Sequence, residues 1–208
     1  MSMRISELSA TTGISVPTLK FYLREGLLPP GASRARNQAT YDERHLRRLR
    51  LIRALTEVGQ LSLREVKAVL AAADDPRTQV HDLLGTAQYA LEPPVSDDVD
   101  PGATAIVDEA IESLGWHVSA DAPARRSIGR AVDVLRSFGW TVRPTDLVRY
   151  AKAVDGLAKR EVTIADDAAD RERLVERMVI GSVLFDEILS AFRRLAQEHH
   201  SAGRDRSS

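Results

Sequence analysis

The sequence predicts a mainly α-helical chain with one small β-hairpin near its N-terminus, and three observations lead to this fold class. Apolar residues recur at helical spacing along most of the 208 residues. The stretch 29–41 (PPGASRARNQATY) interrupts that spacing with two prolines and a glycine. The stretch 92–101 (EPPVSDDVDP) combines three prolines with acidic residues, which is typical of a linker. We therefore expect an N-terminal helical domain that carries the hairpin, followed by an all-helical C-terminal domain.

Composition restricts the classes of protein to which the chain can belong. Apolar residues make up 43% of the sequence, which is enough to build a buried core. No apolar run is long enough to span a bilayer, and the first residues, MSMRISELS, lack the apolar centre of a signal peptide. Cysteine is absent, which excludes disulfides and thiolate metal sites. We expect a cytoplasmic protein without a membrane partner.

Charge is distributed unevenly along the chain. Residues 1–73 contain 12 Lys and Arg against 6 Asp and Glu, whereas residues 74–208 contain 17 against 24. A basic N-terminal part joined to an acidic remainder suggests that the first part meets a polyanion, although small domains often differ by a few charges.

The first two helices are predicted close together. The first covers about residues 5–12 and ends at Gly13, a residue that readily adopts the left-handed conformation. The second begins at Ser15, a good N-cap, and tolerates Pro17 because first-turn amides have no partner within a helix. It ends at Gly26. The near absence of a linker between the two helices is typical of a helix-turn-helix.

The stretch 29–41 reads as an extended loop or small β-hairpin, which would form a wing beside the helix-turn-helix. Asp42 then caps a third helix, which we expect to end at Gly59. Its apolar stripe consists of Leu46, Leu49, Ile52, Leu55 and Val58, and the rest of its surface is crowded by Arg44, Arg47, Arg48, Arg50 and Arg53.

A capping box formed by Ser62 and Glu65 begins a fourth helix, whose inward side chains are Val66, Val69 and Leu70. A short connecting helix is expected at about 77–91, and further helices at about 103–115, 122–138, 144–158 and 167–200. The pattern predicts three segments: a DNA-binding-type head at 1–73, a connecting helix and linker at 74–101, and a helical effector-binding or dimerisation domain at 102–208 with a disordered tail from about 200.

The second helix carries side chains suited to DNA. A helix-turn-helix places the start of its second helix in the major groove. Thr18 can touch a base methyl or a phosphate, and Lys20 can reach a guanine edge or a phosphate. The hydroxyl of Tyr22 can bond a phosphate oxygen, which sets register rather than sequence. Phe21 fits a DNA contact and a core position equally well.

Three stretches together resemble the DNA-binding domain of the MerR family of bacterial transcriptional regulators: RISELSATTGIS, SVPTLKFYLREGLLPP and ATYDERHLRRLRLIRALTEVGQLSLREVKAVL. The resemblance covers about a third of the chain. It implies a winged helix-turn-helix that binds a palindromic promoter operator as a homodimer at the nucleoid. It also implies that the protein bends and untwists this DNA so that RNA polymerase engages both promoter elements. The partners implied are double-stranded DNA, a second copy and, indirectly, RNA polymerase.

The resemblance also assigns roles to single residues. Lys20 and Tyr22 match a basic-aromatic-tyrosine motif of the family, Tyr41 matches the tyrosine that closes the wing, and Arg53 matches an arginine that grips phosphate. Pro17 stands where relatives usually carry a basic residue. The customary wing arginine is missing, and either Arg34 or Arg36 would have to replace it. The predicted DNA-binding set is Ser15, Pro17, Thr18, Lys20, Phe21, Tyr22, Arg34, Arg36, Tyr41 and Arg53.

The C-terminal two-thirds does not resemble the metal sensors of the family. We expect no metal and no cofactor, because cysteine is absent and His199 and His200 read as an exposed tail pair. Dimerisation could use either residues 77–91 or the apolar helix at 172–196. A small apolar effector could bind between helices, although the same aromatic residues could equally fill a core; the candidate pocket consists of Trp116, Trp140, Tyr150 and Phe185.

An alternative function is that of an architectural or recombination accessory DNA-binding protein without an effector. The helical body of more than 100 residues argues against it, because such factors with this head are usually small. An enzyme is not expected, since the sequence holds no nucleophile–base set, metal cluster or glycine-rich phosphate loop.

Overall fold

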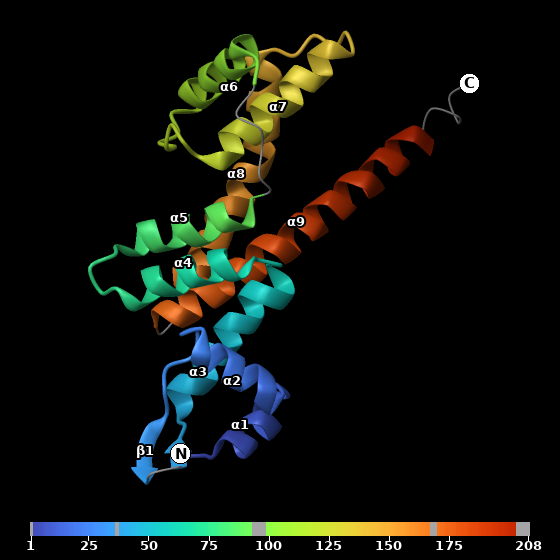
Figure 1. Ribbon diagram of the computed structural model, residues 1–208. Coiled ribbons are helices and arrows are strands. Elements are labelled where there is room, and N and C mark those ends of the chain that lie inside the picture. Colours follow the sequence, from blue (N-terminus) through green and yellow to red (C-terminus); the bar gives the residue numbers. More distant parts are fainter. Residues whose placement is uncertain (1, 36–37, 93–98, 167–169, 203–208) are drawn as a thin grey trace. The chain divides into compact units, whose positions relative to one another are not determined.

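The computed structural model describes residues 2–35, 38–92, 99–166 and 170–202, and it confirms the mainly α-helical class with a small β wing (Figure 1). The chain forms two compact units, one made of Met1–Gln88 with Asp167–Ser208 and the other of Tyr89–Asp166. The long last helix therefore belongs to the same unit as the N-terminal helices. The division into functional domains at 1–73, 74–101 and 102–208 remains a prediction.

Helices α1 (Ile5–Thr12) and α2 (Val16–Arg24) form the expected helix-turn-helix. Gly13 has a φ of 72° and its N–H donates to the Ser9 carbonyl at 2.9 Å, so the chain reverses within two residues. Leu8 and Leu19 are completely buried, one from each helix. The turn at Gly13 and the burial of the two leucines together fix the orientation of α2 relative to α1.

The wing consists of strands β1 (Ala32–Ala35) and β2 (Gln38–Thr40), which pair antiparallel with Ala32 opposite Thr40. At its base the backbones of Met3 and Tyr41 exchange two hydrogen bonds of 2.8 Å each. The wing is thereby tied to the first residues described.

After the wing come α3 (Glu43–Arg53), the π-helical turn η1 (Ala54–Val58) and α4 (Leu63–Asp74). The expectation of one regular helix up to Gly59 was wrong in its last turn, where the Gly59 N–H donates to the Ala54 carbonyl at 2.8 Å, a five-residue spacing. The predicted capping box of α4 is confirmed, because the Ser62 N–H donates to Glu65 Oε2 at 2.8 Å.

Helix α9 (Arg171–Ala202) packs its first turns against α3, η1 and α4, burying Leu174, Val175 and Val179. Its C-terminal part continues beyond the other elements of this unit (Figure 1). Along α9, the apolar side chains of Leu184 and Phe185 are 44% and 36% exposed.

Arg171 fastens the start of α9 to the end of α4. Its guanidinium donates to the carbonyls of Ala72, Ala73, Asp75 and Thr78 at distances between 2.8 and 3.4 Å. The last carbonyls of a helix have no partner within it, so the arginine satisfies the carbonyls of Ala72 and Ala73 in the last turn of α4. Residues almost 100 positions apart in the sequence are joined in this way.

Arg48 forms a second link at the same junction. It was expected on the charged outer face of the third helix, but it is only 4% exposed and pairs with Asp74 and with Glu172 Oε1, the latter at 3.1 Å. Burial raises the pKa of Glu172, and the charge of Arg48 opposes that rise. Arg48 turns inward because Asp74 of α4 and Glu172 of α9 supply the carboxylates that a buried guanidinium needs.

The second unit contains α6 (Pro101–Leu114), α7 (Pro123–Ser137) and α8 (Pro144–Asp166), and α6 packs against both of the others. The chain enters this unit within α5 (Val80–Leu91). Small side chains dominate its buried positions, which include Ala103, Val107, Ala110, Ala122 and Val132. Helix α8 runs beyond the predicted end at 158 because no glycine or proline follows there until after residue 166.

Two helix ends in this unit repeat one device. Gly115 and Gly139 have φ values of 66° and 81°, and the tryptophan after each one donates its backbone N–H to a carbonyl five residues earlier. The two ends also share a sequence pattern, SLGWHV at 113–118 and SFGWTV at 137–142, and their equivalent geometry explains it. The predicted linker falls largely on 93–98, and the tail largely on 203–208, both outside the described residues; α9 itself continues to Ala202.

Replacing Arg171 with Ala should lower the free energy of unfolding by about 2 kcal/mol, because charged hydrogen bonds to buried carbonyls are lost. Urea unfolding followed by circular dichroism measures this change. The matched control is Arg173→Ala, two residues along α9 with an exposed side chain, which should cost less than about 0.5 kcal/mol. Equal effects of both variants would contradict the assigned role of Arg171.

Candidate nucleic-acid interface

The start of α2 is shaped by Ser15. Its extended backbone ends the turn, and its Oγ accepts the Thr18 N–H at 3.2 Å, as predicted for an N-cap. The two hydroxyls are also bonded to each other at 2.7 Å. Because Ser15 and Pro17 are both exposed, the first turn of α2 is open to a partner.

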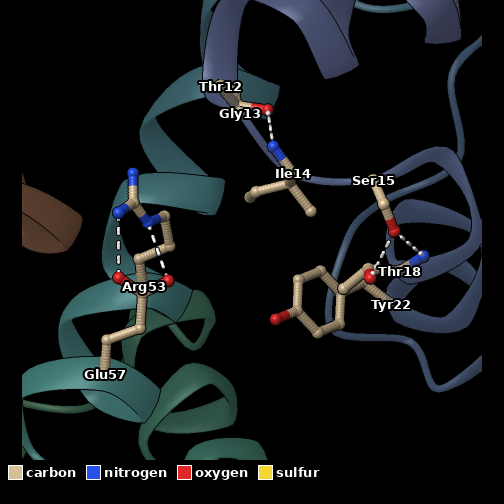
Figure 2. A pocket seen from close by; sticks show the side chains of 8 residues that line it. All are labelled: Thr12, Gly13, Ile14, Ser15, Thr18, Tyr22, Arg53 and Glu57. Carbon is tan, nitrogen blue, oxygen red and sulfur yellow. Dashed lines mark hydrogen bonds and ion pairs between the residues drawn. The ribbon is translucent and has the colours of Figure 1, made fainter.

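A hollow of about 390 Å³ lies beside this first turn (Figure 2). One wall comes from α1, the turn and α2, and the opposite wall from the end of α3 and from η1. Its lining residues are Thr12, Gly13, Ile14, Ser15, Thr18, Tyr22, Arg53 and Glu57. The hollow therefore brings four of the predicted DNA-binding residues together: Ser15, Thr18, Tyr22 and Arg53.

Arg53 and Glu57 form an ion pair on the second wall. The Arg53 Nε and Nη2 donate to the two carboxylate oxygens of Glu57 at 2.9 and 2.8 Å, as the paired dashed lines in Figure 2 show. The hydrogen bonds from Arg53 lower the pKa of Glu57, and Glu57 in turn raises the pKa of Arg53. Both groups are therefore charged at neutral pH, and the side chains are 49% and 57% exposed.

Tyr22 projects from α2 into the hollow, with its hydroxyl on the side of Arg53 and Glu57 (Figure 2). Partial burial is the main reason why the pKa of Tyr22 is raised; the negative charge of Glu57 adds to the rise and the positive charge of Arg53 opposes it. The phenol stays protonated at neutral pH, so it can donate a hydrogen bond to an anion.

The other side chains of α2 and its C-cap either are exposed to solvent or pack against and pair with neighbouring residues. Lys20 is exposed. Phe21 is half-buried beneath the guanidinium of Arg24, whose central carbon lies 5.5 Å from the ring centre. Glu25 pairs with Lys67 of α4 at 3.0 Å, which lowers the pKa of Glu25 and fixes the end of α2.

The predicted wing residues are placed differently from one another. Tyr41 is only 4% exposed and packs edge-on against His45, with ring centres 5.1 Å apart, so its side chain supports the base of the wing. Arg34 lies within β1 and Arg36 falls outside the described residues. Direct contact of these residues with DNA remains a prediction.

Four residues that line the hollow lie outside the predicted DNA-binding set: Thr12, Gly13, Ile14 and Glu57. Thr12 accepts the Ile14 N–H at 3.3 Å and so belongs to the turn itself. Glu57 could have been found, because it follows Arg53 by four positions on the same helix face, the spacing of a helical ion pair.

The four predicted pocket residues are not gathered in one unit. Trp116, Trp140 and Tyr150 belong to the second unit, with exposed fractions of 37%, 66% and 69%. Phe185 is on α9 in the first unit and is 36% exposed. An effector pocket built from them remains a prediction.

Among the described residues, no three or more side chains of the metal-ligating types are grouped so that they could hold an ion. The rings of His199 and His200 lie 5.2 Å apart near the end of α9. No helix within the described ranges combines the length and apolar character required to cross a bilayer.

Comparison with known proteins matches residues 3–73 to the MerR HTH family regulatory protein model. The nodulation protein NolA of Bradyrhizobium sp. (strain NC92) is 38% identical over 81 residues, which are 39% of this chain and 32% of NolA. The regulator CueR of Salmonella typhi is 31% identical over 81 residues, 39% of this chain and 58% of CueR. The matched part thus spans between about a third and three fifths of these curated relatives.

One solved structure resembles nearly the whole chain. It is a crystal structure of SCO5550 from Streptomyces coelicolor A3(2), a protein assigned as a transcriptional regulator. It is 36% identical in sequence, with a TM-score of 0.73, and the alignment covers 97% of both chains. The similarity therefore extends to α5–α9, which lie beyond the matched DNA-binding domain.

Proposed function

Because the chain belongs to the MerR family of bacterial transcriptional regulators, we propose that it binds a palindromic promoter operator as a homodimer and distorts it. The observation that carries this proposal is the hollow beside the first turn of α2, which is lined by Ser15, Thr18 and Tyr22 on one wall and by Arg53 on the other. Such a set of donors suits a DNA phosphate.

The side chains of the head divide into two roles. Tyr22 and Arg53 contact the backbone and set the register of α2 on the duplex. Lys20, exposed one turn along the helix, reaches a base edge or a neighbouring phosphate in the major groove. With two heads and two wings on one operator, enough backbone contacts form to offset a bending cost of roughly 1–10 kcal/mol. RNA polymerase then responds to the altered DNA rather than to a direct contact.

The second half of α9 supports the dimer. Its exposed apolar side chains follow one another at alternating steps of three and four residues: Phe185, Ile188, Phe192 and Leu195, with exposed fractions of 36%, 50%, 66% and 58%. This is the spacing of a coiled-coil seam. Among the two segments considered for dimerisation, α9 is favoured over α5, whose periodic positions Leu83 and Ala87 are already buried within the chain.

An antiparallel arrangement of two α9 helices matches the seam to itself. With the two-fold axis at Ser190, Phe185 of one chain faces Leu195 of the other, and Ile188 faces Phe192. The same register brings the acidic pair at 186–187 opposite the basic pair at 193–194. A single register thus satisfies both the apolar and the charged positions.

Replacing Ile188 with Asp should convert the dimer into a monomer, because a carboxylate would be buried at the centre of the seam. Sedimentation velocity measures the change. Gln197→Asp, which adds the same charge on α9 outside the apolar stripe, serves as the control and should leave the dimer intact. Wild-type protein that sediments as a monomer would refute dimerisation through α9.

Replacing Lys20 with Ala should weaken binding to the intergenic DNA beside the protein's own gene by about tenfold. The slope of log K against log salt concentration should become shallower by about 0.9, the contribution of one phosphate contact. Thermal stability should not change, because the side chain is exposed. Fluorescence anisotropy of labelled DNA measures the affinity, and Lys159→Ala on α8 is the charge-matched control. A loss of stability equal to the loss of affinity would make Lys20 a structural residue.

We extend the proposal to the segment 102–208, which would receive a small apolar effector through the exposed aromatic residues of the second unit. A bound effector should shift the fluorescence of Trp116 and Trp140, both of which lie in that unit. A screen of small apolar compounds tests this, and Trp140→Phe identifies which tryptophan responds. A screen without any response favours the alternative, an architectural DNA-binding protein that has no effector.

A further inference from the structure

Arg53 faces the hollow, and one edge of its guanidinium is already occupied. Its Nε and Nη2 bond both oxygens of Glu57 at 2.9 and 2.8 Å. A DNA phosphate that approaches this edge would use the same fork of donors, because a guanidinium binds phosphate and carboxylate with the same bidentate geometry. Carboxylate and phosphate cannot both hold those two N–H groups at once.

We propose that Glu57 is an internal competitor of the DNA backbone for Arg53, and that it lowers the affinity of this head for duplex DNA of arbitrary sequence. The inference rests on the proposed function, since it assigns a property to the same DNA-contacting surface. The predicted DNA-binding set does not include Glu57. Its carboxylate is negatively charged, whereas side chains that bind the DNA backbone are usually positively charged.

The competition is weak enough to be reversible. Both side chains are about half exposed, and exposed ion pairs contribute little to stability. A phosphate can therefore displace the carboxylate without unfolding η1. However, Glu57 is four residues from Arg53 on the same wall of the hollow, so the displaced carboxylate stays beside the incoming phosphate.

The competition has a measurable electrostatic consequence. A cationic side chain that neutralises one phosphate steepens the salt dependence of binding by about 0.9 in the logarithmic plot, through release of a counterion. When that side chain must first leave a carboxylate, the freed carboxylate takes up a cation, and the net release is close to zero. Arg53 should therefore contribute almost nothing to the salt dependence while Glu57 is present.

The operator complex differs from a complex with arbitrary DNA in how firmly the phosphate is held. Base contacts from α2 keep the operator backbone in one register, within reach of the Tyr22 hydroxyl and Arg53 together. A loosely held phosphate on arbitrary DNA competes less well with a carboxylate fixed to the same helix. Glu57 therefore weakens arbitrary binding more than operator binding.

The experiment uses the full-length chain and a fluorescein-labelled duplex of arbitrary sequence, about three helical turns long, titrated from low to moderate salt. Glu57→Gln should bind about three- to fivefold more tightly at low salt, with a slope steeper by about 0.9. Arg53→Gln tests whether the gain passes through Arg53: in the Arg53→Gln background, Glu57→Gln should lose the three- to fivefold gain and keep only the small effect of removing one negative charge. Circular dichroism confirms that each variant is folded.

The control is Glu109→Gln on α6, an exposed residue of the second unit that gives the same change in net charge. The inference is overturned if Glu57→Gln binds like the wild type, if its gain persists in the Arg53→Gln background, or if Glu109→Gln gives the same gain. Wild-type protein that binds no duplex at any salt concentration overturns the proposed function itself, and the inference with it.

Discussion

The docking of Arg171 onto the end of α4 is the interaction on which the first unit depends. Four backbone carbonyls accept from one guanidinium, so the longest helix of the chain begins at a fixed point on the DNA-binding head. Everything that α9 carries further along, including its exposed apolar stripe, is positioned from that point. The DNA-binding head and the apolar stripe that we propose as the dimer seam therefore belong to one unit.

The neighbouring charges at this junction act in a different way. Burial raises the pKa of Glu172, so its protonated form is favoured in the folded protein relative to the unfolded chain. That contribution to stability is fully present below pH 4.5 and is lost as the pH rises through the raised value. At neutral pH the Glu172 carboxylate therefore opposes burial, which its pairing with Arg48 offsets only partly. Arg171, which donates to uncharged backbone carbonyls, holds the junction instead.

Local chemistry allowed much of the head to be predicted. Ser15, Gly13 and the box of Ser62 and Glu65 act on residues within a few positions, so their roles are legible in the sequence. The inward turn of Arg48 was not predictable, because its partners lie in α4 and α9 and only the folded chain brings them near. The spacing of Arg53 and Glu57 indicated that they pair. The hollow that they line could not be predicted, because its other wall comes from α1 and α2.

The length of α9 has a geometric consequence of its own. From Arg171 to Ser190 the helix rises about 28 Å, so an antiparallel pair centred on Ser190 would separate the two docking points by about 57 Å along its axis. In that arrangement the length of α9 would set the separation of the two DNA-binding heads. Each added or removed turn before Ser190 would alter that separation by about 11 Å and leave the docking faces in nearly the same rotation. In the proposed dimer, the length of α9 before Ser190 would therefore set the distance between the two half-sites of the operator.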